Sequence, residues 1–125
     1  MVLIEEEKTR KLIACFFEVY NHLGAGFIES VYKDALALEF NIREIPFEKE
    51  KLLYTYYKSI KLDKHFLLDF LCFDSVIIEV KAVSSILPIH KMQLHNYLKA
   101  SNLKVGLLVN FGETSLKFER VIKKE

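Results

Sequence analysis

The chain has 125 residues and a formal net charge of +1, with 51% hydrophobic and 28% charged residues. This length and composition indicate one globular domain spanning residues 1–125. They argue against a membrane protein, because no stretch reaches the ~18 apolar residues of a membrane span. The amino terminus has too few apolar residues for a signal peptide, and Cys15 and Cys72 lie in apolar runs without zinc spacing. We therefore expect a cytoplasmic protein with free thiols.

Two helices are predicted in the first third of the chain. Residues 6–22 repeat apolar side chains at helical spacing, and Gly24-Ala25-Gly26 ends that helix. A second helix is predicted over residues 28–40, and Pro46 closes the connector after it. The predicted buried stripe of the second helix consists of Val31, Ala35, Leu36 and Leu38.

The next segment changes its apolar period from helical to two and is rich in aromatic and β-branched residues, which favours strands. The first strand ends at Tyr57, and a turn at Lys58-Ser59 leads into a strand over residues 60–73. A turn at Asp74-Ser75 leads into a third strand over residues 76–82. These segments form a three-stranded meander.

A helix over residues 88–100 follows, with Pro88 in its first turn. Residues 104–111 form an almost continuous apolar run, typical of a central strand, and residues 116–122 form the last strand. The helix between residues 82 and 104 has the length of a right-handed parallel crossover. The order α-α-β-β-β-α-β-β therefore predicts an α/β (α+β) fold with a mixed five-stranded sheet flanked by helices.

Three charged side chains interrupt the apolar strands of the meander. Glu79 and Lys81 are two residues apart, so they share one face of a strand, and Asp69 lies on the strand before it. If the two strands pair across the turn, two carboxylates and an ammonium meet at the far end of the hairpin. That group is typical of a divalent-metal site with a cation beside it. On spacing alone, an exposed polar strand face is the more frequent explanation.

The chain resembles the PD-(D/E)XK nuclease superfamily over about residues 11–122, and within it the GxxExxY proteins. Asp69 and Glu79-Val80-Lys81 match the superfamily motif, although Leu68 stands where the superfamily name has proline. The namesake motif of the smaller group is Gly26-Phe27-Ile28-Glu29-Ser30-Val31-Tyr32. Gln93, Tyr97 and the segment Gly106-Leu107-Leu108-Val109-Asn110-Phe111 complete the resemblance.

The resemblance implies a restriction-endonuclease-like core and a nuclease that uses Mg²⁺ or Mn²⁺ to cut DNA, leaving a 5′ phosphate. It implies that Asp69, Glu79 and the Val80 carbonyl hold the metal, and that Glu29 joins them directly or through water. Lys81 would orient the attacking water and stabilise charge on the phosphate. The resemblance also implies that Gln93 and Tyr97 help to hold DNA and the arrangement of lysine and metal.

Other functions stay open at this point. One alternative is a catalytically silent module of the same fold that binds nucleic acid or protein, and another is a subunit whose partner recognises DNA. A homodimer would supply the two sites needed to cut two strands, and a larger complex would serve the same end. The lysines at positions 58, 61 and 64 indicate a solvated face more often than phosphate contacts.

Overall fold

The computed structural model describes residues 4–125; residues 1–3, the start of the segment assessed above for a signal peptide, lie outside the described residues. The elements in chain order are α1 (Glu6–Leu23), α2 (Glu29–Ile42), β1 (Phe47–Tyr57), β2 (Ile60–Cys72), β3 (Val76–Lys81), α3 (Pro88–Ser101), β4 (Val105–Asn110) and β5 (Lys117–Ile122). This order confirms the predicted one. Within residues 4–125, no helix combines the length and apolarity needed to cross a bilayer.

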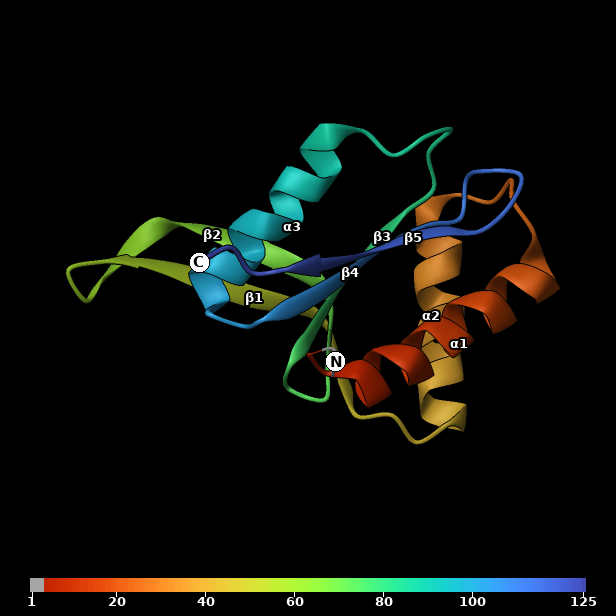
Figure 1. The fold of residues 1–125 in the computed structure, drawn as a ribbon, viewed down its shortest axis with the longest axis horizontal. Helices are drawn as coiled ribbons and strands as arrows, with labels where there is room; N and C mark the ends of the chain where they lie inside the picture. The colour runs from red at the N-terminus through yellow and green to blue at the C-terminus, as the bar shows by residue number, and fades with distance from the viewer. Residues whose placement is uncertain (1–3) are drawn as a thin grey trace.

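The five strands form one sheet in the order β1-β2-β3-β4-β5. Only β3 and β4 are parallel, and α3 connects them, while the other neighbours are antiparallel. The helices α1 and α2 cover one face of this mixed sheet and α3 covers the other (Figure 1). The predicted mixed five-stranded sheet flanked by helices is therefore confirmed, with the helices on both faces.

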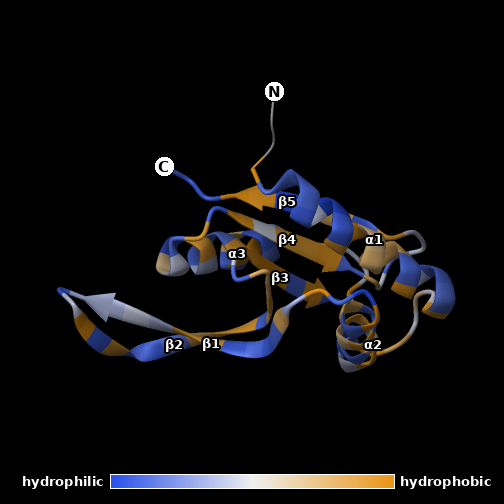
Figure 2. Cartoon of the chain, turned by 90° about the horizontal axis from the view of Figure 1, so that it is seen from below, coloured by the Kyte–Doolittle hydropathy of each residue, from blue (hydrophilic) through white to orange (hydrophobic). Residues whose placement is uncertain are grey.

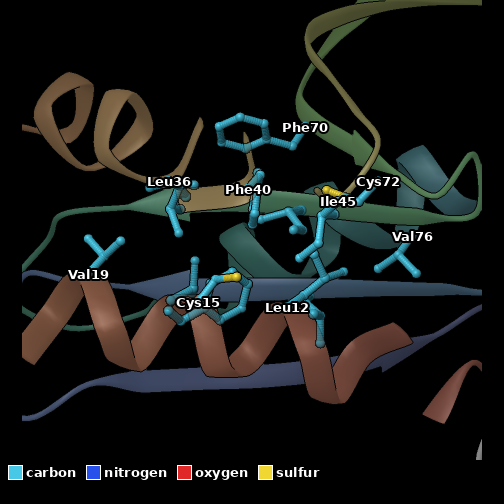
Figure 3. Close-up of a cluster of buried hydrophobic side chains, with 14 of the residues drawn as sticks. Leu12, Cys15, Val19, Leu36, Phe40, Ile45, Phe70, Cys72 and Val76 are labelled. Carbon is cyan, nitrogen blue, oxygen red and sulfur yellow. The ribbon is translucent and has the colours of Figure 1, made fainter. Parts of the chain in front are cut away.

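The larger core lies between the sheet and the pair α1 and α2 (Figure 3). The labelled side chains that meet there are Leu12, Cys15 and Val19 from α1, Leu36 and Phe40 from α2, Ile45, and Phe70, Cys72 and Val76 from the sheet. A smaller cluster under α3 contains Leu68, Ile77, Leu94, Tyr97, Leu98, Leu108 and Val121. Both faces of β3 and β4 are thus buried, which explains their almost continuous apolar sequence.

The predicted stripe of α2 was wrong at Leu38, which is 62% exposed. Leu36 is buried as expected, but its buried neighbours are Tyr32 and Phe40, four residues away on each side. The aromatic rings decide this face, because Phe40 packs edge-on against Phe70 with 5.2 Å between ring centroids. The spacing of the aliphatic residues alone therefore predicted a helix face that is rotated from the buried one, which follows Tyr32, Leu36 and Phe40.

The turn at Lys58-Ser59 is confirmed, and both residues have left-handed backbone, with φ of 50° and 64°. Two consecutive residues of this kind fit the twist of a two-residue hairpin. The second turn begins one residue earlier than predicted: β2 ends at Cys72, which pairs with Val76. Phe73 then starts the turn, because its φ is 57° and it leaves the extended conformation of the strand.

Candidate functional site

The strands β2 and β3 separate where the two predicted carboxylates lie. Their backbone ladder ends at the pair Phe70 and Ile78. Beyond it, the Asp69 N–H donates to Oε2 of Glu79 at 2.9 Å, and the Val80 N–H donates to Oδ2 of Asp69 at 2.7 Å. The two side chains therefore replace the missing ladder bonds, and their carboxylates lie together between the diverging strands.

The environment of Glu79 disfavours negative charge. Glu79 is 3% exposed. Its burial, followed by the negative charge of Asp69, raises the pKa of Glu79 to about 8. Burial and the charge of Asp69 also raise the pKa of Glu29 on α2. The charges of Lys81 and Lys33 lower the pKa of both glutamates, but burial and the charge of Asp69 outweigh them, and a bound cation would add further positive charge.

The helix α3 supplies the polar partners of the other predicted residues. Nζ of Lys81 donates to Oε1 of Gln93 at 3.4 Å. Tyr97, one turn further along α3, is 4% exposed, and its ring lies 5.1 Å from that of Phe66. Burial, followed by the charges of Glu79 and Asp69, raises the pKa of Tyr97 to about 12, so its phenol stays protonated. The structure thus places Lys81 and Tyr97 near the carboxylate pair, and Gln93 against Lys81.

Lys33 was not predicted as a site residue, yet it contacts the site directly. Its Nζ lies 3.1 Å from Oδ1 of Asp69 and 3.4 Å from Oε1 of Glu50, and its side chain is 14% exposed. Partial burial lowers the pKa of Lys33, but the hydrogen bond and charge of Asp69 and the charge of Glu50 outweigh it and raise the pKa overall. The sequence signal that could have identified Lys33 is its position four residues after Glu29, on the same face of α2.

The structure explains both ends of the motif of residues 26–32, the glycine by its backbone conformation and the tyrosine by its contacts. Gly26 has a φ of 115°, which L side chains rarely adopt. The Tyr32 hydroxyl donates to the Gly24 carbonyl at 2.5 Å and accepts from the Phe27 N–H at 3.2 Å. Its ring stacks on Phe111 with 4.5 Å between centroids. Tyr32 therefore anchors the loop that leads into Glu29, the first residue of α2.

Replacing Tyr32 by phenylalanine is expected to lower the free energy of unfolding by about 1–2 kcal/mol, because a backbone carbonyl and an N–H lose their partner while the ring still packs. Denaturant unfolding measures this change. The matched control is Tyr57→Phe, since Tyr57 is 63% exposed and the structure gives its hydroxyl no hydrogen bond within residues 4–125. Equal losses in both variants would contradict the anchoring role of Tyr32.

Asn110 is the second residue that the sequence did not single out. It is fully buried at the end of β4. Its Oδ1 accepts from the N–H groups of Val83 at 3.0 Å and Gly112 at 3.1 Å, and its Nδ2 donates to the Val83 carbonyl at 2.9 Å and to Oε2 of Glu113 at 2.8 Å. Asn110 therefore fixes the chain two residues after Lys81.

The residues present fit magnesium better than a metal that needs a complete protein cage. Within residues 4–125, no three His, Cys, Asp or Glu side chains are grouped closely enough to form a ready metal site. Magnesium keeps several waters and is commonly held through one or two carboxylates and substrate phosphates. Asp69 and Glu79 are two carboxylates that could hold such an ion, and Glu29 lies close enough for its pKa to respond to Asp69.

Comparisons with known proteins agree with this architecture. Residues 6–121 match the family model of the PD-(D/E)XK nuclease superfamily. Among solved structures, the fold is similar to the one titled "Crystal structure of SSO0001", with a TM-score of 0.62, 19% sequence identity and 77% of this chain covered. The match covers 50% of that chain, so the present chain spans about half its length. No curated protein matches the sequence.

Proposed function

Since this chain belongs to the PD-(D/E)XK nuclease superfamily, we propose that it is a magnesium-dependent nuclease that cuts DNA. We also propose that it is one of the GxxExxY proteins, on the basis of the motif from Gly26 to Tyr32. The observation that carries the proposal is the carboxylate pair between β2 and β3. Glu79 is buried there beside Asp69, with a pKa near 8 that burial and the second carboxylate both raise.

In this proposal Asp69 and Glu79 hold Mg²⁺ or Mn²⁺, together with the Val80 carbonyl, and Glu29 completes the site directly or through water. When bound, the metal neutralises phosphate charge and lowers the pKa of the attacking water. The pair suits a hard cation because carboxylate oxygens are the ligands that magnesium prefers. A cation also removes the cost of two neighbouring carboxylates that both ionise.

Lys81 orients the attacking water and stabilises the charge that develops on the phosphate. Its ammonium has three donors and no acceptor, so it serves as a cation and not as a metal ligand. Gln93 accepts one of its hydrogen bonds at 3.4 Å and keeps the ammonium on the α3 side of the site. The phenol of Tyr97 stays protonated, so it can donate a hydrogen bond. Gln93 and Tyr97 both help to hold DNA. The expected product has a 5′ phosphate.

The free thiols bear on where the protein works, and a double-stranded substrate would bear on its oligomeric state. We propose a cytoplasmic protein, since Cys15 and Cys72 are buried free thiols. A homodimer or larger complex would bring two sites to the two strands of a duplex.

Incubating the purified protein with linear, circular and single-stranded DNA is expected to show cleavage that requires Mg²⁺ or Mn²⁺. Lys81→Met is expected to reduce the rate by about 10²–10³-fold, the usual effect of losing one charge-stabilising donor, and Asp69→Asn by at least as much. The rate of fragment release measures this, and end analysis identifies the 5′ phosphate. Lys117→Met, an exposed lysine on β5, is the control.

Cleavage that persists in both site variants would come from a contaminant and would contradict the proposal. Wild-type protein that binds DNA with a steep salt dependence but never cuts it would instead identify a silent binding module, because phosphate contacts give that dependence without chemistry.

A further inference from the structure

The hairpin formed by residues 51–67, here called the arm, projects from the body of the protein (Figure 2). Its strands pair with each other from Lys51 and Leu68 to Tyr57 and Ile60, whereas β2 pairs with β3 only from Phe70 onwards. Seven residues of β1 therefore extend as a two-stranded ribbon over about 20 Å. Residues 56–65 are all exposed. A ribbon of two strands with so little packing has marginal stability by itself, which suggests that it serves a purpose other than forming the core.

The charge of the arm differs from that of the rest of the chain. The arm contains four lysines and one aspartate, whereas the remaining residues contain fourteen Lys and Arg against sixteen Asp and Glu. Lys58, Lys61 and Lys64 form no ion pair within residues 4–125. The positive charge of the protein is thus concentrated on one projecting element, where it can meet phosphates.

Aromatic rings lie among these lysines. Tyr56 is 61% exposed and Tyr57 is 63% exposed, and as consecutive strand residues they point to opposite faces of the ribbon. Nζ of Lys58 lies 5.4 Å from the centroid of the Tyr57 ring, and Nζ of Lys61 lies 3.6 Å from that of Tyr54. Exposed rings with lysines beside them are the combination that binds unpaired bases and their phosphates.

The arm begins at the proposed catalytic site. Asp69 is the residue at which β2 separates from β3, and the arm continues directly from it. A surface hollow of about 380 Å³ lies between Phe66 at the base of the arm and Gln93 and Tyr97 on α3. A nucleic-acid strand that lies in this hollow would contact Gln93 and Tyr97 on α3 and Phe66 at the base of the arm.

We propose that the arm binds an unpaired segment of the nucleic acid that the site cuts, so this inference rests on the proposed function for its biological meaning. Lys58, Lys61 and Lys64 contact the phosphates, and the strand crosses the tip of the ribbon, so that one base stacks on Tyr56 on one face and another on Tyr57 on the opposite face. Duplex bases hide their faces within the stack, so the exposed rings favour a single strand. A second copy of the arm is a poor partner because both copies carry the same positive charge.

The test measures binding without cleavage, in EDTA and with Lys81→Met in every protein. Fluorescence anisotropy follows labelled single-stranded DNA, single-stranded RNA and duplex DNA of one sequence at several salt concentrations. Replacing Lys58, Lys61 and Lys64 together by alanine is expected to weaken single-strand binding and to reduce the slope of log affinity against log salt by about 2, since each phosphate contact contributes about 0.7.

The tyrosines are tested separately because stacking does not depend on salt in the same way. Tyr56→Ala and Tyr57→Ala are each expected to lower single-strand affinity about fivefold or more with an unchanged salt slope. Tyr56→Phe and Tyr57→Phe keep the rings and are expected to keep the affinity. The charge-matched control replaces Lys104, Lys117 and Lys124, which are exposed towards the β5 edge of the sheet, and is expected to leave the slope unchanged.

Several results would overturn the proposal: an unchanged slope in the arm variant, tighter binding of the duplex than of the single strand, or alanine and phenylalanine variants that behave alike. Arm variants that change only the sedimentation of the protein would identify a self-association surface instead. These results are independent of catalysis. If protein with an intact site cleaves DNA but the arm variants bind single strands normally, only the proposed role of the arm is rejected. If binding depends on the arm but protein with an intact site never cleaves, only the proposed nuclease activity is rejected.

Discussion

Replacing Glu79 by glutamine is expected to stabilise the metal-free protein at pH 8 while it abolishes cleavage. The folded protein raises the pKa of Glu79 from 4.5 to about 8, first by burial and then by the charge of Asp69. Between about pH 4.5 and 8, the folded protein therefore keeps a proton on Glu79 that the unfolded chain has already lost. The free energy of unfolding falls as the pH rises through this window, by a total of the order of 4 kcal/mol.

Glutamine removes this dependence because it is neutral at every pH. Its side-chain oxygen still accepts from the Asp69 N–H, the hydrogen bond that Glu79 makes at 2.9 Å. Denaturant unfolding in EDTA at pH 5, 6, 7 and 8 is expected to give a falling curve for the wild type and a flatter one for Glu79→Gln. The control is Glu119→Gln on the exposed side of β5, whose curve should parallel the wild type. A parallel curve for Glu79→Gln would contradict the assignment of the buried proton.

Added magnesium tests whether this site is more than a buried acid. A metal that binds ionised Glu79 must displace its proton, so below pH 8 binding is expected to release protons and to tighten as the pH rises. Added magnesium should then stabilise the wild type at pH 8 more than Glu79→Gln. Stabilisation with loss of activity in the same variant is the pattern of a side chain retained for function at a cost in stability.

The local parts of this structure were predictable from the sequence. The change of apolar period after Pro46 marked the strands, and the spacing of Glu79 and Lys81 placed them on one face of β3. The charged residues within the apolar strands also predicted the place of the candidate site. These signals depend on residues that are close in sequence, where the geometry of one helix or strand determines which side chains share a face.

The missing parts depend on contacts between distant segments. Lys33 is an ordinary surface-type lysine in sequence, and only the approach of α2 to the end of β2 brings it within 3.1 Å of Asp69. The face of α2 followed the rings of Tyr32 and Phe40, and their partners lie on β2 and just after β4. The opening of the sheet at Asp69 likewise has no local signal, because it results from how β2 leaves β3.

Asn110→Ala is expected to lower the free energy of unfolding by about 3–5 kcal/mol and to reduce cleavage. The substitution leaves the N–H and carbonyl of Val83 and the N–H of Gly112 without the partner that Asn110 gives them. These groups are part-buried, so each one left unpaired costs towards the lower end of about 1–3 kcal/mol. Alanine cannot bridge from β4 to this loop. Denaturant unfolding measures the loss, and Asn41→Ala, at an exposed position on α2, is the matched control.

The effect on cleavage follows from what Asn110 holds in place. The Phe111 N–H donates to the Lys81 carbonyl at 2.9 Å. The chain is therefore held to the end of β4 at Lys81, by Phe111, and again at Val83, by Asn110. Without the Val83 contacts, Lys81 remains in the chain but its ammonium is no longer fixed relative to Asp69 and Glu79. Asn110→Asp separates the two parts of the interaction: it keeps the acceptor for the Val83 N–H, but it loses the donor and places a second carboxylate beside Glu113. We therefore expect Asn110→Asp to be destabilised as well, and a variant as stable and active as the wild type would show that the Val83 loop needs no anchor from β4.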